Sequence, residues 1–381
     1  MPSIYEESHE LFRQSFRSWV EAEIVPRREE FESAGIMDRE LYAAAGKHGF
    51  VGMAVPEEYG GGGTRDFRFN AVIAEELAET SAGGGGLGLT LHNDITTPYF
   101  IEYCNEEQAK RWLPGIASGE LITAIAMTEP GTGSDLAAVV TSAVRDGDEY
   151  VLNGAKTFIT NGINSDLVIV VCRTKPEGGH DGMSLLVVER SMPGFERGRN
   201  LHKIGQHSAD TAELFFSDVR VPAANLLGEE GRAFEYLSFN LAQERLSIGL
   251  YGLAAARAAL GWTVDYVKQR TAFGQPIAKF QNTKFVLAEV ATEIEVTTPF
   301  VNDCILELNA GELTPSKAAM AKMWGSELQN RAIDRCLQLF GGYGYMAEYP
   351  IGPAYVDARI ATIYGGTSEI MKTIIAKDVL G

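Results

Sequence analysis

The hydrophobic pattern of this chain changes its period twice, and this change constrains the fold more than any other feature. Residues 1–120 place apolar side chains at helical spacing, as at Phe12 and Phe16. Residues 121–228 carry short β-branched or aromatic runs instead, and residues 229–381 return to helical spacing. The sequence therefore predicts an α+β multidomain plan with a helical domain at 1–120, a domain of strands at 121–228 and a helical domain at 229–381.

The middle region has the features of a small antiparallel sheet or barrel. Asp146-Gly147 stands between two stretches of alternating apolar residues, as a tight hairpin requires. Further short runs flanked by Gly, Pro or Asp are Val168–Val171, Leu185–Val188 and Leu214–Phe216.

The C-terminal region predicts long helices. One helix of about 40 residues passes through Leu237 and ends before a break at Thr271–Pro276. Further helices are expected at 277–310 and 315–340, and a last one from Ser368.

Three glycine-rich segments need an interpretation. Gly60–Gly63 and Gly83–Gly86 interrupt the N-terminal helical pattern and are interpreted as flexible turns between helices. Residues 342–347 fit the glycine pattern of dinucleotide-binding folds, but a helical pattern precedes them and Glu348-Tyr349-Pro350 follows. Because that fold needs a strand before the glycines and a helix after them, we reject a Rossmann site.

Charge and composition exclude several classes of protein. The net charge of −18 disfavours a broad electrostatic hold on nucleic acid. The sequence contains no run of about 18 apolar residues, so no membrane span is predicted. The four cysteines and six histidines lack the spacing of a metal site, which leaves mostly buried, reduced thiols. The acidic, polar N-terminus lacks the features of a signal or transit peptide, so a cytoplasmic, bacterial-type protein is expected.

Five segments combine glycine, hydroxyl, aromatic or arginine side chains in a way that suits ligand binding. The residues of each segment alone leave a ligand site and an ordinary structural role both open. The segments are Met127–Asp135 (MTEPGTGSD), Phe158–Gly162 (FITNG), Gln269–Gln275 (QRTAFGQ), Gln338–Gly342 (QLFGG) and Ile363–Ile370 (IYGGTSEI).

In their order and spacing these five segments resemble the acyl-CoA dehydrogenase family over essentially the whole chain. The long-chain branch is the most similar, through LHKIG at 201–205, TAELFF at 211–216, QERL at 243–246 and AYVDAR at 354–359. The resemblance implies an N-terminal helical domain, a middle β-barrel and a C-terminal four-helix bundle. It also implies FAD as cofactor, an acyl-CoA substrate, electron-transfer flavoprotein as partner and a homotetramer.

Carried over position by position, the resemblance implies three groups of cofactor-binding residues. The first would hold the isoalloxazine and ribityl parts, and consists of Ile125, Met127, Thr128, Gly133, Ser134, Phe158, Ile159 and Thr160. The second would reach the pyrophosphate and adenosine across a subunit interface, and consists of Arg270, Gln281, Gln338, Gly341 and Gly342. Thr367, Ser368 and Glu369 would complete the site. Many relatives carry Trp where this chain has Phe158, which still supplies an apolar ring.

The position of the catalytic base departs from most of the family. Most members carry Glu directly before the Gly-Thr of the last motif, where this chain has Gly365. The long-chain and isovaleryl branches place the base in an E-R-L context, which matches Glu244 here. Since the loss at Gly365 and the gain at Glu244 occur together, Glu244 is predicted to be the base. Gly365 would keep the backbone N–H that polarises the thioester carbonyl and would leave space where the carboxylate stood.

The other substrate-binding residues implied by the resemblance are Ser134, Arg245, Tyr364 and Gly366. The function expected is α,β-dehydrogenation of an acyl-CoA in fatty-acid or related acyl-CoA breakdown. Two alternatives stay open: oxygen chemistry on the same fold, as in acyl-CoA oxidases or flavin monooxygenases, and a silent partner subunit of a mixed tetramer. Acyl chain length and branching cannot be read from the sequence.

Overall fold

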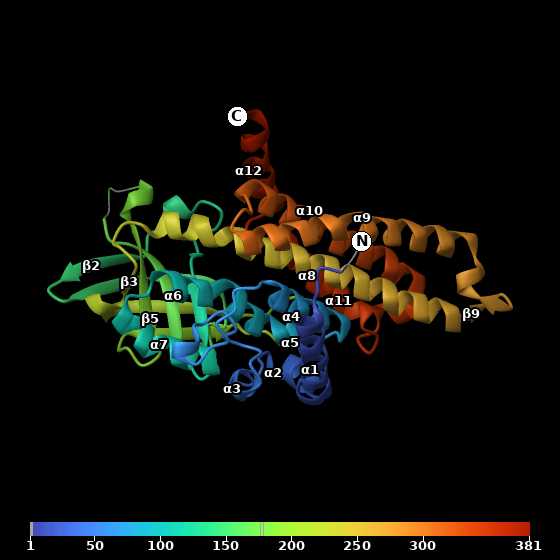
Figure 1. Ribbon diagram of the computed structural model, residues 1–381, viewed down its shortest axis with the longest axis horizontal. Helices are drawn as coiled ribbons and strands as arrows, with labels where there is room; N and C mark the ends of the chain where they lie inside the picture. The colour runs from blue at the N-terminus through green and yellow to red at the C-terminus, as the bar shows by residue number, and fades with distance from the viewer. Residues whose placement is uncertain (1–2, 176, 178) are drawn as a thin grey trace.

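The computed structural model describes residues 3–175, 177 and 179–381, and it has the predicted order of helices, strands and helices (Figure 1). The N-terminal helices are α1 (Glu7–Glu23), α2 (Arg28–Ala34), α3 (Glu40–Lys47), α4 (Arg68–Glu79), α5 (Gly83–Thr90), α6 (Thr97–Tyr103) and α7 (Glu106–Ser118). A π-helical turn at Leu91–Thr96 joins α5 to α6. None of the described helices is long and apolar enough to cross a membrane.

The middle region forms one twisted sheet with hydrogen-bonded order β6-β7-β3-β2-β4-β5-β8, and β1 pairs with β4. Most pairs are antiparallel, as predicted, but β1 and β2 run parallel to β4. The strands are β1 (Thr123–Ala126), β2 (Ser142–Asp146), β3 (Glu149–Thr160), β4 (Leu167–Arg173), β5 (Met183–Glu189), β6 (Phe195–Asn200), β7 (Thr211–Pro222) and β8 (Leu226–Leu227). The predicted hairpin after Asp146 joins β2 to β3.

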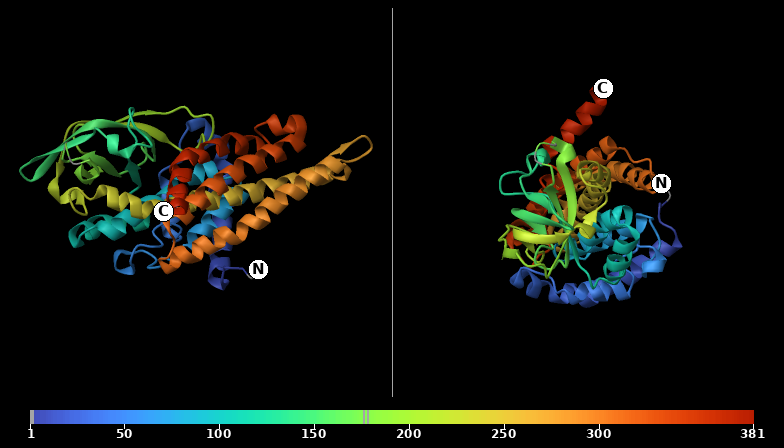
Figure 2. Two further views of the ribbon diagram at one scale, coloured as in Figure 1. Left: turned by 90° about the horizontal axis from the view of Figure 1, so that it is seen from above. Right: turned by 90° about the vertical axis from the view of Figure 1, so that its left-hand side faces the viewer.

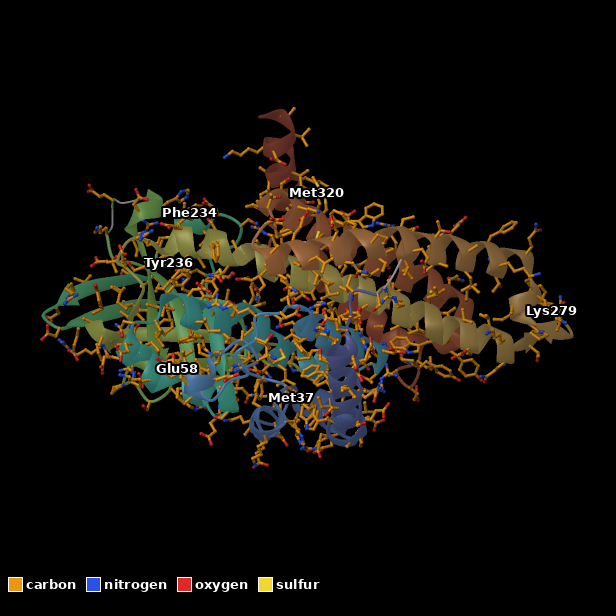
Figure 3. All side chains as sticks on the ribbon, in the orientation of Figure 1. Met37, Glu58, Phe234, Tyr236, Lys279 and Met320 are labelled. Atoms are coloured by element: carbon orange, nitrogen blue, oxygen red, sulfur yellow. The ribbon has the colours of Figure 1, made fainter. Side chains whose placement is uncertain are left out.

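The C-terminal region contains the long helices that the apolar spacing predicts. They are α8 (Ala233–Gln269), α9 (Gln281–Ala310), α10 (Pro315–Phe340), α11 (Ile351–Ala358) and α12 (Ser368–Leu380). A two-stranded hairpin of β9 (Thr271–Ala272) and β10 (Gln275–Pro276) separates α8 from α9, at the predicted break. Helix α8 runs from the sheet to the far end of the molecule. Figure 3 shows Tyr236 of α8 at the sheet end and Lys279, just before α9, at the far end.

The helices α8 and α10 pack with their backbones in close contact. A β-carbon on Gly249 of α8 would lie 2.4 Å from the carbonyl oxygen of Ala321 on α10. One turn further along, a β-carbon on Gly252 would lie 2.5 Å from the carbonyl oxygen of Gly325. Glycine at both positions lets the two helices approach until the backbones touch. The helix α12 begins against α10 and projects from the body towards its C-terminal end (Figure 2).

The interpretation of Gly83–Gly86 as a flexible turn is wrong, because these residues form the first turn of α5. The packing explains why four consecutive glycines occur in a helix. A β-carbon on Gly83 would lie 1.7 Å from the phenol oxygen of Tyr251, and one on Gly86 would lie 2.4 Å from the methyl carbons of Leu77. These glycines therefore make room for neighbouring side chains rather than for a turn.

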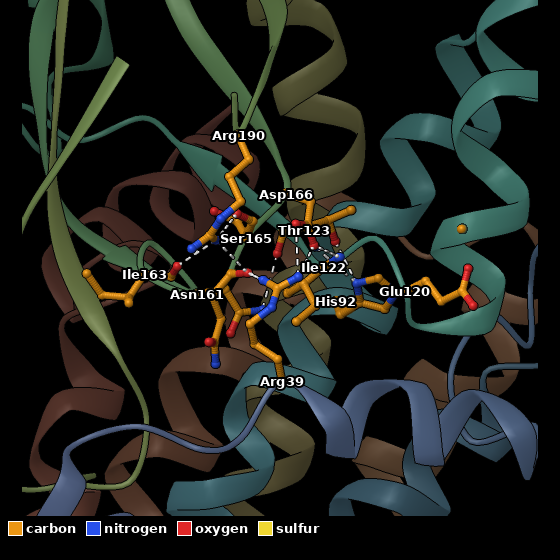
Figure 4. Close-up of polar contacts among 12 residues, drawn as sticks. Arg39, His92, Glu120, Ile122, Thr123, Asn161, Ile163, Ser165, Asp166 and Arg190 are labelled. Atoms are coloured by element: carbon orange, nitrogen blue, oxygen red, sulfur yellow. Dashed lines mark hydrogen bonds and ion pairs between the residues drawn. The ribbon is translucent and has the colours of Figure 1, made fainter. Parts of the chain in front are cut away.

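A polar network joins the N-terminal helices to the sheet (Figure 4). The guanidinium of Arg39 donates to both carboxylate oxygens of Asp166, at 2.9 and 2.8 Å. The amide of Asn161 donates to the backbone oxygen of Thr123 at 3.2 Å, while its side-chain oxygen accepts from the Tyr42 hydroxyl at 2.8 Å. Asn161 follows β3 directly, so this network fixes the end of the strand that carries Phe158, Ile159 and Thr160.

Candidate active site

A cavity of about 590 Å³ opens where α8 passes the sheet. Its walls come from α4, α5 with the π-helical turn, β1 and the loop after it, the end of β3, Gln206, the middle of α8, and the segment that leads into α12. Of the predicted site residues, the ones that line it are Ile125, Met127, Thr128, Gly133, Ser134, Phe158, Ile159, Thr160, Glu244, Arg245, Tyr364, Gly365, Gly366 and Thr367. The structure thus brings segments more than 200 residues apart in the sequence to one cavity.

The carboxylate of Glu244 is buried at the wall of this cavity. Its side chain leaves α8 with 4% of its surface exposed, and the hydroxyl of Tyr99 on α6 donates to it at 3.1 Å. Burial raises the pKa of Glu244 to about 7, and the Tyr99 hydrogen bond and the charge of Arg245 oppose this rise. A carboxylate with a pKa near neutrality is a stronger base than an ordinary surface glutamate and is still ionised in part at pH 7.

Arg245 follows Glu244 but does not pair with it as on a solvated helix surface. Its side chain is buried, and its Nε has no hydrogen-bond partner among the described residues. An unpartnered buried N–H is costly unless a ligand accepts from it. The side chain therefore points to a ligand with an acceptor group in this cavity.

The space beside Gly365 differs from the expectation. Gly365 lines the cavity with φ +62°, a conformation that favours glycine. A β-carbon there would lie 2.2 Å from Cδ1 of Ile248, which stands one helical turn after Glu244 on α8. The volume expected to be vacated by a missing carboxylate is therefore filled by the tip of Ile248.

The loop after β1 and the end of β3 are fixed to each other. The N–H of Thr157 donates to the backbone oxygen of Thr128 at 3.0 Å. The fully buried ammonium of Lys156 donates to the backbone oxygen of Met127 and pairs with Glu129, each at 2.9 Å. Phe158 lies in a register shift of β3 after Lys156, at φ +61°, and the residue is 66% exposed. The two segments therefore form one rigid wall that carries the exposed side chain of Phe158.

The residues of this wall fit a flavin. A flat apolar ring, hydroxyl side chains at Thr128, Ser134 and Thr160, and backbone groups around Gly133 suit a planar heterocycle with polar edges. Next in the chain to the cavity residue Thr367, the hydroxyl of Ser368 is buried without a hydrogen-bond partner among the described residues. This orphaned group at the start of α12 is what a cofactor oxygen or ring nitrogen would satisfy.

Other predicted cofactor residues lie away from this cavity. Arg270, Gln338, Gly341 and Gly342 line a separate cavity of about 560 Å³ where α8 and α10 end, and the Arg270 guanidinium lies 5.6 Å from the centre of the Tyr343 ring. Gln281 is the first residue of α9, just after the β9–β10 hairpin. Within one chain these five residues are not brought to Glu244, whereas Ser368 and Glu369 follow the cavity residue Thr367 in α12.

Several residues of the site were not predicted from the sequence. Tyr99, the hydrogen-bond donor to Glu244, comes from a helix 145 residues before it, and no local pattern links the two. Leu241, Ile248 and Tyr251 line the cavity. They lie three or four residues apart on the same face of α8 as Glu244, so helical spacing from Glu244 could have predicted them.

The described residues contain no group of three or more His, Cys, Asp or Glu side chains placed to hold a metal ion. All four cysteines are free thiols, and Cys172, Cys304 and Cys336 are buried, as expected from their spacing. His92 is buried between the backbone oxygen of Ile116 and the hydroxyl of Thr123, and burial lowers its pKa to about 4.

The pKa of Glu244 leads to a testable pH dependence. Only the ionised carboxylate accepts a proton, so a reaction that uses it as base should rise with pH to a plateau, with a midpoint near pH 7. Below pH 6 the rate should fall about tenfold per pH unit. Stopped-flow measurement of flavin reduction between pH 5 and 9 tests this. A midpoint near the ordinary glutamate value of 4.5, or a flat profile, would contradict it.

The whole chain is similar to known acyl-CoA dehydrogenases. Models of the acyl-CoA dehydrogenase N-terminal, middle and C-terminal domains match residues 6–120, 124–219 and 231–380. A mitochondrial long-chain specific acyl-CoA dehydrogenase of Sus scrofa is 48% identical over 99% of this chain and 87% of its own length. An acyl-CoA dehydrogenase of Bacillus subtilis (strain 168) is 38% identical over 97% of each chain.

The fold is also that of solved acyl-CoA dehydrogenases. The crystal structure of an acyl-CoA dehydrogenase from Geobacillus kaustophilus superposes with a TM-score of 0.97, at 50% identity over the whole of both chains. The three domain models together span most of the chain, and the two relatives named above are 48% and 38% identical to it. The chain belongs to the acyl-CoA dehydrogenase family of oxidoreductases.

Proposed function

We propose that this enzyme removes the α proton and the β hydride from an acyl-CoA thioester to give the trans-2-enoyl-CoA, with Glu244 as the base. The observation that carries the proposal is the buried Glu244 carboxylate at the cavity wall, with its pKa raised to about 7 and one hydrogen bond from Tyr99. The α C–H bond breaks, its proton goes to Glu244, and its electron pair forms the new C=C bond as the β hydride leaves.

The family uses FAD, and FAD supplies the acceptor for the β hydride when it is bound. In the proposed complex, Met127, Thr128, Gly133, Ser134 and the Phe158–Thr160 segment hold the ring system against the sheet. Their rigid connection through Lys156 and Thr157 supports this assignment. Thr367, Ser368 and Glu369 complete the site from the opposite side, where the Ser368 hydroxyl lacks a partner.

The thioester carbonyl would be polarised near the loop before α12. In the proposed pose the N–H of Gly365 donates to the carbonyl oxygen and stabilises the negative charge that develops when the α proton leaves. Arg245 offers a buried positive charge with an unpartnered Nε close to the same cavity. Tyr364 and Gly366 complete the wall that would hold the thioester in place.

We further propose a homotetramer that passes electrons to an electron-transfer flavoprotein. Arg270, Gln281, Gln338, Gly341 and Gly342 would then serve the pyrophosphate and adenosine of a neighbouring subunit's FAD. None of them lines the cavity of Glu244, and all but Gln281 line a second cavity, which supports this arrangement. Light scattering of the FAD-loaded protein tests the tetramer.

Anaerobic mixing of the FAD-loaded enzyme with a panel of straight, branched and bulky acyl-CoAs tests the proposed reaction. Loss of the flavin absorbance, followed by slow reoxidation in air, supports a dehydrogenase. Rapid reoxidation with formation of hydrogen peroxide would favour an acyl-CoA oxidase or related monooxygenase. A stable assembly that no thioester reduces would favour a silent subunit, which the buried Glu244 counts against.

A further inference from the structure

The loop that ends the cavity has little conformational restraint of its own. Gly365 and Gly366 are consecutive glycines with φ values of +62° and +100°, and both line the cavity. Glycine has more backbone freedom than any other residue, so two in a row need an outside contact to hold one conformation. On the far side, Thr367 caps α12 by accepting from the N–H of Ile370 at 3.3 Å.

That outside contact comes from Lys322 on α10. Its ammonium donates to the backbone oxygen of Gly366 at 2.6 Å. The residue has 0% of its surface exposed, and its ammonium forms no ion pair with any described carboxylate. A buried charge without an ion pair is costly, and an apolar side chain of the same length would fill the space more cheaply if packing were its only role.

The place of Lys322 in the bundle connects it to the proposed base. It follows Ala321, whose carbonyl oxygen touches Gly249 at the point where α8 and α10 meet. Glu244 and Arg245 lie about one turn away from Gly249 on α8. One rigid helix pair therefore carries the proposed base on one member and the anchor of the glycine loop on the other.

We propose that Lys322 is a positioning residue for α-proton removal: by holding the carbonyl of Gly366 it fixes the loop whose Gly365 N–H faces the thioester oxygen. This inference rests on the proposed function. Lys322 keeps its proton throughout and touches neither substrate nor cofactor in this role. Its loss should loosen the loop, so the thioester carbonyl is less well polarised when Glu244 takes the α proton.

A readout that isolates the proton step tests this role. An acyl-CoA with sulfur in place of the β carbon cannot be dehydrogenated, yet its α protons can exchange with D2O in the holoenzyme. Lys322→Met is expected to slow this exchange by ~10- to 100-fold. Bound FAD per subunit and the Kd of the analogue should stay within about twofold, because their main contacts lie elsewhere.

Two matched variants separate a positioning role of Lys322 from a non-specific effect of replacing a lysine. Lys322→Arg keeps the charge and the donors and should recover most of the exchange rate. Lys372→Met makes the same chemical change at an exposed lysine of α12 and should leave the rate unchanged. Should Lys322→Met fail to give holoenzyme, Lys322→Gln, which has a shorter and neutral donor, carries the same expectation.

Exchange in Lys322→Met or Lys322→Gln holoenzyme within twofold of the wild-type rate would overturn the positioning role and leave the proposed function intact. Equal slowing in Lys372→Met would also overturn it. Absence of exchange in the wild-type enzyme would instead contradict the proposed function itself.

Discussion

Replacing Glu244 with Gln is expected to slow flavin reduction by acyl-CoA by on the order of 10³-fold or more, because the amide cannot accept the α proton. The buried site should tolerate the change, since Gln has the same shape and can still accept from the Tyr99 hydroxyl. Anaerobic stopped-flow absorbance of the FAD-loaded variant measures the rate, and FAD content with the Kd for acyl-CoA shows that binding survives.

Asp265→Asn provides the matched control for this variant. It removes a carboxylate from the same helix at an exposed position, and it should reduce flavin at the wild-type rate. Near-normal flavin reduction by Glu244→Gln would show that another group is the base. A second variant adds Glu at Gly365 to Glu244→Gln; activity should stay low, because the site has φ +62° and Ile248 fills the space, and should rise only when Ile248→Ala is added.

Lys156→Met is expected to have the largest effect on stability. The change leaves the Glu129 carboxylate buried against two backbone N–H donors, those of Val140 and Thr141, without its cation. Removing one partner of a buried pair typically costs about 3–5 kcal/mol, since an uncompensated charge remains. The midpoint of denaturant unfolding should fall accordingly, and FAD affinity should fall with it because the Met127 carbonyl loses its anchor.

The double variant Lys156→Met with Glu129→Gln tests the cause of this loss. It removes both charges and should recover part of the stability, since no buried charge is left unpaired. Arg220→Met breaks an exposed pair with Glu149 between β7 and β3, and should change the unfolding midpoint little. Equal decreases in the unfolding midpoint for Lys156→Met and Arg220→Met would contradict the importance of burial.

Local patterns predicted the elements whose apolar spacing is regular. The long helix through Leu237, the break after it and the hairpin after Asp146 all follow from period and turn residues. The Gly83–Gly86 segment was misinterpreted because its glycines make room for the side chains of Tyr251 on α8 and Leu77 on α4. Glycine spacing alone does not distinguish a turn from a helix that must let other side chains in.

In the candidate site, too, residues in contiguous segments could be predicted, and residues that depend on contacts between distant segments could not. Contiguous segments such as Phe158–Thr160 and Tyr364–Thr367 line the same cavity. Tyr99 and Lys322 could not be found from the sequence, since Tyr99 of α6 bonds Glu244 of α8 and Lys322 of α10 bonds the backbone oxygen of Gly366 in the loop before α12. Gly249 and Gly252 permit the close approach of α8 and α10, but a glycine within a helix does not indicate which distant residue it faces.

The most direct test of Glu244 as the base is a crystal structure of the holoenzyme with the acyl-CoA analogue that has sulfur in place of the β carbon. A Glu244 carboxylate oxygen is predicted to lie within about 3.5 Å of the α carbon, on the face of the substrate opposite the flavin. A Glu244 carboxylate turned away from the α carbon, or a different carboxylate beside it, would contradict the assignment.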